Sequence, residues 1–282
     1  MKVGFNLYLW TDRVEPRHYA ILKDLKAAGY DGVEVPILAG PPEEYARLSR
    51  VLDDLGLART TAGAFLDPGK DPLSPERAVR AAALRDSVEM LDRAQAVGAS
   101  LMAGPFYQVL GQFTGQGPTE DELQRAADFH LAMGEAAAAR GVVVALEPLN
   151  RFEAYLINLA RDAEAHVKRV GHPNIAMMFD TFHANIEERD PVRAYVETAA
   201  STVHIHISEN DRGAPGNGHV RWAETFRAIK ASGYDGWLTI EAFGRGLPSM
   251  AAACRIWRDL TATPEEVYLT GIRTIREGWA AA

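Results

Sequence analysis

The sequence predicts an α/β protein that closes into a (β/α)8 barrel, also called a TIM barrel. Eight short apolar runs alternate with longer helical patterns along the chain, and this alternation is typical of strand–loop–helix units. The runs begin roughly 25 to 45 residues apart, which is the length that one such unit needs. No linker-like or low-complexity stretch interrupts the 282 residues, so we expect one domain over residues 1–282.

Eight strands are expected, most of them rich in β-branched or other apolar residues. They are residues 3–10, 32–35, 58–63, 99–105, 142–147, 175–180, 202–207 and 237–241. A doubly wound open sheet is the alternative arrangement of such units. It would usually carry a G-x-G-x-x-G phosphate fingerprint after its first strand, and this sequence has none there.

Two of the predicted helices have clear signals at both ends. Ser74 is the expected cap of a helix that ends at Gly98. Thr119 and Glu122 have the spacing of a capping box, and the helix that they begin is expected to end at Gly141.

The last helix is expected over about residues 264–280, at the C-terminal end of the barrel domain. Thr263 and Glu266 form a second capping box at its start. We expect this helix to belong to the barrel, because no linker separates it from the last predicted strand.

Composition excludes several classes of protein. The formal net charge is −8 and no run of Lys or Arg exceeds two residues, so a nucleic-acid partner is not expected. Cys254 is the single cysteine; no internal disulfide is possible, which suits a reducing cytosol, and we expect a buried apolar residue there. No apolar run approaches the ~18 residues of a membrane span, and there is no secretory signal pattern. We therefore expect a soluble, cytoplasmic protein.

Four consecutive predicted strands end in side chains that suit a metal site. Glu147, Asp180 and Glu241 stand at the ends of the fifth, sixth and eighth strands, and His206 lies in the seventh. Strand residues alternate between faces, so all four are expected to point inward at the carboxyl end of the barrel, where barrel enzymes place their chemistry. His204 lies one layer deeper, and a core or supporting role is expected for it.

Three carboxylates at one point repel one another unless a cation lies among them. An oxygen-rich set with one imidazole suits a divalent ion, and Mn²⁺ is the expected one, with Co²⁺ or Mg²⁺ as alternatives. Simpler interpretations exist for each residue alone: Glu147 could pair with Arg151, and Asp180 could cap the turn that follows it.

The same residues carry a resemblance to a known family. The segments "ALEPLNRFE", "FDTFHANIEE", "HIHISENDRGAPGNGHVRW" and "GYDGWLTIEAF" resemble those of the ketose 3-epimerases. These enzymes belong to the wider xylose-isomerase-like sugar isomerases and epimerases. The resemblance runs in order over nearly the whole chain and is densest between residues 140 and 260.

The resemblance implies an activity. The chain would interconvert free ketoses that differ at C3, of the D-tagatose, D-allulose/D-fructose or L-ribulose type. The reaction would proceed by proton abstraction and return through a cis-enediolate. A homodimer or homotetramer is the implied assembly, with a small-molecule sugar as substrate.

The resemblance also implies roles for individual residues. Glu147, Asp180, His206 and Glu241 would bind the metal, and Glu147 and Glu241 would also be the acid/base pair. Three further residues would contact the sugar, and they are Glu153, His183 and Arg212.

The chain departs from the family pattern near the first strand. Many of these epimerases have an aromatic residue near position 6, where this chain has Asn6. Tyr8 and Trp10 follow it and are candidates to line the sugar site. The Gly-rich loop over residues 104–120 is expected to be either a lid or a flexible surface loop, with the aromatic residues Phe106, Tyr107 and Phe113 as candidate walls of the pocket.

Three other functions remain open from the sequence. An aldose–ketose isomerase of the hydroxypyruvate-isomerase or sugar-phosphate type could use the same barrel, but a phosphate would favour basic residues, and only Arg151 and Arg212 are near. An abasic-site DNA endonuclease would need a basic groove, which the acidic charge disfavours. A non-catalytic sugar-binding barrel would not need paired glutamates on two strands.

Overall fold

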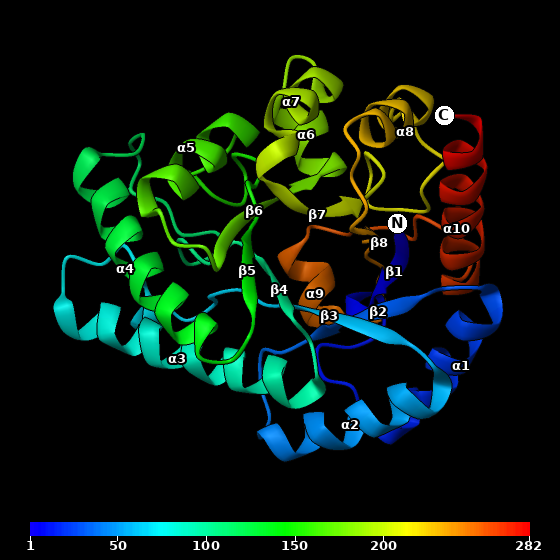
Figure 1. The fold of residues 1–282 in the computed structure, drawn as a ribbon, viewed down its shortest axis with the longest axis horizontal. Coiled ribbons are helices and arrows are strands. Elements are labelled where there is room, and N and C mark those ends of the chain that lie inside the picture. Colours follow the sequence, from blue (N-terminus) through cyan, green and yellow to red (C-terminus); the bar gives the residue numbers. More distant parts are fainter.

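The protein is a closed barrel of eight parallel strands, described over residues 1–282 by a computed structural model (Figure 1). The strands pair in chain order from β1 to β8, and β8 pairs with β1 to close the ring. They are β1 Lys2–Asn6, β2 Gly32–Pro36, β3 Ala58–Ala62, β4 Leu101–Gly104, β5 Val143–Leu146, β6 Ile175–Asp180, β7 Thr202–Ile207 and β8 Trp237–Ile240. The predicted (β/α)8 fold is confirmed.

Ten α-helices connect and surround the strands (Figure 1). None of them combines the length and the apolar character that crossing a membrane requires. They are α1 Tyr19–Ala28, α2 Pro42–Leu55, α3 Arg77–Val97, α4 Glu120–Ala138, α5 Ala160–Val170, α6 Thr181–Glu187, α7 Pro191–Thr198, α8 Trp222–Ala231, α9 Pro248–Ala253 and α10 Pro264–Ala281. The helix predicted over 264–280 is α10, which packs against β1 and α1.

Side chains alternate along the strands as the sequence predicts. In β5, Val144 and Leu146 belong to the main apolar core, which includes residues of strands and helices alike. Ala145 instead belongs to a small separate cluster with Ala103 of β4 and Met178 of β6. Because the two clusters are distinct, the outward and inward faces of the strands are distinct too.

The first strand is shorter than predicted. It ends at Asn6, and a 3-10 turn over Leu7–Leu9 follows it. The Asn6 side chain accepts a hydrogen bond from the Tyr8 backbone N–H at 2.9 Å, which caps this turn. The apolar run therefore continues past the strand because the turn is buried, and burial does not require a strand.

The capping predictions succeed at two helices and fail at a third. Thr119 and Glu122 form a reciprocal capping box at the start of α4. At α10, Thr263 accepts from the Glu266 N–H. The prediction for Ser74 was wrong, because α3 begins at Arg77. The Ser74 hydroxyl accepts a hydrogen bond from the backbone N–H of Glu76, in the turn before the helix.

Of the two glycines predicted to end helices, Gly98 does so and Gly141 does not. Gly98 is the left-handed cap of α3, as predicted, with φ +78°. The regular part of α4 ends at Ala138, and Gly141 takes φ +66° in the turn that follows. Residues 139–141 form a turn between the end of α4 and the start of β5.

Candidate metal centre and active site

The four predicted metal ligands meet at the carboxyl end of the barrel. All are buried, and each offers one donor atom within 4.8 Å of the others. The Nδ1 atom of His206 lies 3.5 Å from Glu241 Oε1, 3.7 Å from Asp180 Oδ2 and 3.8 Å from Glu147 Oε1. One nitrogen therefore faces three carboxylates that arrive from three other strands.

The strand ends place these side chains. Asp180 of β6 pairs in register with His206 of β7, so both side chains point to the same side of the sheet at the same height. Asp180 Oδ1 accepts from the Phe182 N–H at 2.6 Å and caps α6. Its Oδ2 remains turned toward the cluster, so the capping role considered above and a ligand role are compatible.

Two donor atoms of this cluster are buried without a hydrogen-bond partner. They are Glu147 Oε1 and His206 Nδ1. Burial, and then the charge of Glu241, raise the pKa of Glu147 well above its ordinary value. Arg151 does not relieve this charge, because it pairs with Glu187 at 2.9 Å. A divalent cation would give both atoms a partner and offset the repulsion, so the residues present fit such an ion.

Arg212 is buried rather than a surface charge. Its guanidinium lies 3.8 Å from the ring centroid of Phe182 and 4.9 Å from that of Phe243. One of its nitrogens, Nη1, lies 2.5 Å from Glu241 Oε2 and 3.2 Å from Asp180 Oδ2. Burial alone would raise the pKa of Asp180, but the Arg212 charge and the nearby histidines hold it well below its usual range.

The loop after β7 that carries Arg212 is held by a carboxylate that the sequence analysis did not single out. Glu209 is fully buried. One of its oxygens accepts from the backbone N–H groups of Asn210 and Val220, and the other accepts from the Gly216 N–H and the Trp222 indole. This bonding supports the left-handed backbone of Arg212, whose φ is +67°.

His183 and Glu153, the other two residues predicted to contact the sugar, lie beside the proposed metal ligands. His183 accepts from the Asn150 backbone N–H at Nδ1, and its Nε2 lies 2.9 Å from Arg212 Nη2. Burial and then Arg212 lower the pKa of His183, which favours the neutral ring. Glu153 is half-buried and accepts from the Asn150 side-chain amide at 2.9 Å.

A cavity of about 300 Å³ opens beside the cluster. Its walls include Glu147, Glu153, His183, Arg212 and Glu241 on the polar side. Apolar residues also line it, and Met250 and Ala253 of α9 are among them. The volume lies at the lower end of the range for small-molecule sites, so the cavity suits a small ligand.

Comparison with known proteins places the chain in a family. The profile of the xylose isomerase-like TIM barrel family matches residues 22–277. The chain belongs to this family. The ketose 3-epimerase of Arthrobacter globiformis is 31% identical to it, with 98% of this chain and 99% of that protein covered. The D-psicose 3-epimerase of Ruminiclostridium cellulolyticum is 30% identical, with 95% and 93% covered.

A solved structure agrees with these relatives. The D-allulose 3-epimerase from Methylomonas sp., crystallised in complex with D-allulose, superposes with a TM-score of 0.90 at 25% identity. The match covers 98% of this chain and 96% of that chain. The resemblance to ketose 3-epimerases is therefore confirmed, and the relatives of this xylose isomerase-like barrel are isomerases.

Several predicted pocket walls of this xylose isomerase-like barrel lie elsewhere. Phe106 and Tyr107 are fully buried in the main core, and Phe113 is exposed. Tyr8 does line the cavity, whereas Trp10 packs on Phe5 with ring centroids 5.0 Å apart. All three aromatic residues of the 104–120 loop were expected at the pocket, but Phe106 and Tyr107 anchor the loop in the core instead.

Cys254 also differs from its prediction. It caps the C-terminal end of α9 and is half-buried, and it lines the cavity. Burial raises the pKa of its thiol to about 12, so the thiol is protonated at neutral pH. It therefore contributes a small apolar surface to the pocket.

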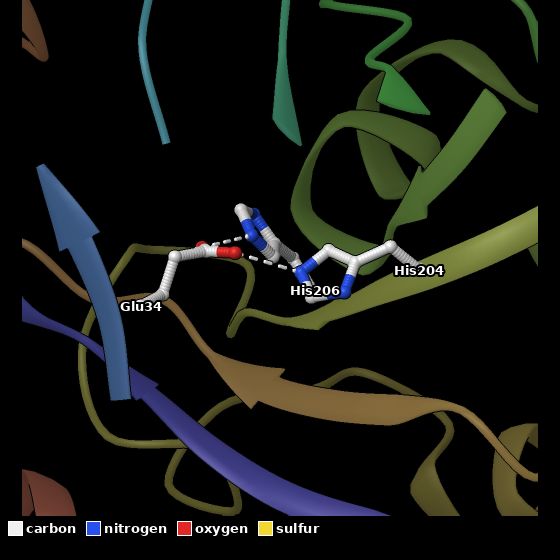
Figure 2. Close-up of side chains that lie close together, drawn as sticks. All are labelled: Glu34, His204 and His206. Atoms are coloured by element: carbon white, nitrogen blue, oxygen red, sulfur yellow. Dashed lines mark hydrogen bonds and ion pairs between the residues drawn. The ribbon is translucent and has the colours of Figure 1, made fainter. Parts of the chain in front are cut away.

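Sequence analysis missed Glu34. This residue of β2 is fully buried and faces the two histidines of β7 (Figure 2). Its Oε1 lies 2.7 Å from His206 Nε2, and its Oε2 lies 2.9 Å from His204 Nε2. A signal was available, because Glu34 stands between Val33 and Val35 and must point to the opposite face of the strand.

Proposed function

We propose that this protein is a metal-dependent ketose 3-epimerase that acts on free ketoses. One observation carries the proposal: Glu147 and Glu241 line a single cavity from the ends of β5 and β8, two strands separated by β6 and β7. Asp180 and His206 complete a set of four donor atoms between them. The names of the relatives support the same activity.

The proposed chemistry is inversion at C3. The hydrogen on C3 of a ketose lies beside the C2 carbonyl and is only weakly acidic. A carboxylate oxygen of one glutamate, Glu147 or Glu241, removes this proton from one face and leaves a cis-enediolate. The other glutamate returns a proton to the opposite face, which inverts the centre, and the two roles exchange in the reverse reaction.

Glu147, Asp180, His206 and Glu241 would hold the metal ion. When bound, a divalent ion polarises the ketone and stabilises the negative charge that develops on its oxygen. We propose Mn²⁺, because the donor set is three carboxylates and one imidazole, and Co²⁺ or Mg²⁺ are the alternatives. The homodimer or homotetramer and the cytoplasmic location stay predictions.

The neighbouring polar residues would orient the sugar. Arg212 and the neutral His183 can donate hydrogen bonds to hydroxyl oxygens, and Glu153 can accept one from a hydroxyl. Beyond Arg212, the only basic residue that lines the cavity is Arg255 at its exposed rim. This shortage of positive charge favours a free sugar over a sugar phosphate.

The test is a substrate panel with metal-stripped protein. The panel holds D-fructose, D-allulose, D-tagatose, D-sorbose, L-ribulose and L-xylulose, together with fructose 6-phosphate and ribulose 5-phosphate, each with and without added Mn²⁺. We expect C3 epimers of at least one free ketose, only when metal is present, and slower turnover of the phosphates. The Asp180→Asn variant, which lacks one proposed ligand, should lose most of the metal-dependent rate.

Two results would contradict the proposal. Absence of turnover of every free ketose by protein that binds Mn²⁺ would rule out the free-ketose epimerase. Formation of an aldose in place of a C3 epimer would favour the aldose–ketose isomerase instead.

A further inference from the structure

Glu34 accepts hydrogen bonds from, or lies close to, four polar groups of the barrel interior. Oε1 lies 2.7 Å from His206 Nε2 and accepts from Asn6 Nδ2 at 3.0 Å. Oε2 accepts from the Thr60 hydroxyl at 2.9 Å and lies 2.9 Å from His204 Nε2. All five side chains are buried, and no Lys or Arg pairs with Glu34.

This arrangement fixes which nitrogen of His206 carries a proton. A carboxylate can only accept hydrogen bonds, so the short contact with Glu34 requires Nε2 of His206 to be the donor. In the neutral ring, Nδ1 then carries the lone pair. Nδ1 is the atom that faces the carboxylates of Glu147, Asp180 and Glu241.

Asn6 links Glu34 to a second proposed ligand. The Oδ1 atom of Asn6 accepts from the Tyr8 N–H, so Nδ2 is the end that faces the barrel interior. Nδ2 donates to Glu34 Oε1 at 3.0 Å and to Glu241 Oε1 at 3.2 Å. The amide therefore orients Glu241 relative to Glu34.

We propose that Glu34 is a positioning residue of the metal centre, which holds His206 as the Nε2-protonated tautomer and steadies Glu241 through Asn6. Its carboxylate and the His206 ring form a carboxylate–histidine pair directed at the proposed ion. Partners of this kind set ligand orientation, and their loss typically lowers metal affinity 10- to 100-fold. The inference rests on the proposed function, because it assumes that the ion binds at Nδ1.

The test compares Mn²⁺ affinity in matched variants of the metal-free protein, measured by calorimetry. Glu34→Leu removes both acceptor oxygens, and we expect a loss of affinity of about 10- to 100-fold. Glu34→Gln retains one acceptor, so its affinity should lie between that of Glu34→Leu and the wild type. Thr60→Val is the control, because it removes one hydrogen bond to Glu34 at a buried site without touching His206 or Glu241.

A second readout uses the metal-free protein at a pH high enough to give the neutral His206 ring. Burial lowers the pKa of His206, but the charges of Glu34 and Glu241 raise it well above its ordinary value. The ¹⁵N chemical shifts of the His206 ring distinguish its two neutral tautomers. We expect the Nε2-protonated form alone in the metal-free wild type and in Thr60→Val, and a mixture in Glu34→Leu. If Glu34→Leu does not fold, the wild-type tautomer and the Glu34→Gln affinity still decide the matter.

Several results would overturn the inference. They are a neutral His206 ring protonated at Nδ1 in the wild type, wild-type affinity in the Glu34 variants, or an equal loss of affinity in Thr60→Val. Failure of the proposed function looks different: wild type and Asp180→Asn would then bind Mn²⁺ equally weakly, whatever the tautomer of His206.

Discussion

At the scale of single residues, Glu147 and Glu241 lie in different surroundings. Glu241 has a partner at each oxygen, with Arg212 on Oε2 and Asn6 on Oε1. Glu147 has an unpartnered Oε1, and its pKa is raised by burial and by Glu241. Two carboxyl groups whose surroundings differ in this way are suited to separate acid and base roles.

This pair makes a direct prediction about activity. Glu147→Gln and Glu241→Gln should each lower kcat at least about 100-fold, because each removes a group that transfers a proton. The measurement is the initial rate of ketose epimerisation at saturating Mn²⁺. Glu197→Gln, on the exposed surface of α7, is the control and should retain the wild-type rate.

A rate within tenfold of the wild type in either glutamine variant would contradict this assignment. Equal and complete loss of bound metal in both variants would leave the acid/base roles unsupported. Metal content is therefore measured on the same samples.

Sequence could predict the metal-facing residues, but for Glu34 it could predict only the direction of the side chain and not its partners. Glu147, Asp180 and Glu241 stand at strand ends, where a polar residue after an apolar run is conspicuous. Glu34 lies inside a strand, and its partner His206 is 172 residues away. Its role becomes visible only when β2 and β7 face each other across the barrel.

At the scale of elements, two buried histidines join α4 to α5. His130 Nδ1 lies 2.8 Å from His166 Nε2, and His130 Nε2 lies 3.1 Å from the Phe106 carbonyl. The carbonyl can only accept, so His130 donates from Nε2 and accepts from His166 at Nδ1. Burial and then Arg169 lower the pKa of His166 to about 4, and burial with His166 lowers that of His130 well below its usual value.

The pair predicts a loss of stability in mild acid. An unfolded histidine titrates near pH 6.5, so below that pH the unfolded chain binds more protons than the folded protein. The free energy of unfolding should fall as the pH drops from about 6.5 to 4, by roughly 3 kcal/mol from His166 alone. Urea unfolding at several pH values measures this slope.

His166→Gln is the matched variant for that experiment, because glutamine keeps an N–H donor and does not titrate. Its unfolding free energy should depend less steeply on pH over the same interval. An identical slope in the variant and the wild type would show that the pair does not contribute.

Element boundaries were predictable where local chemistry sets them. Thr119 and Thr263 cap their helices because a side-chain oxygen satisfies a backbone N–H within the same turn. The end of β1 was predicted wrongly, because the apolar run continues through the buried turn that Asn6 caps. The pairing of β1 with β2 ends at Asn6, which lies opposite Glu34.

At the scale of the whole molecule, the site needs the closed barrel. Proposed metal ligands come from β5 to β8 or just beyond, whereas the residues that support them come from β1 and β2. Pairing of Phe5 with Ile240 joins the two groups of strands. The alternation of apolar runs and helices predicted this closure, but it did not predict that Asn6 and Glu34 meet Glu241 and His206 in the interior.

The central claim is that a proton leaves C3 and is replaced from solvent by way of two glutamates. The most direct measurement is epimerisation of the best free ketose in D₂O by the Mn²⁺-reconstituted protein, with the position of deuterium determined by NMR. The account predicts one deuterium at C3 of the product and none at C1. An epimerised product without deuterium at C3, or with deuterium at C1, would contradict it.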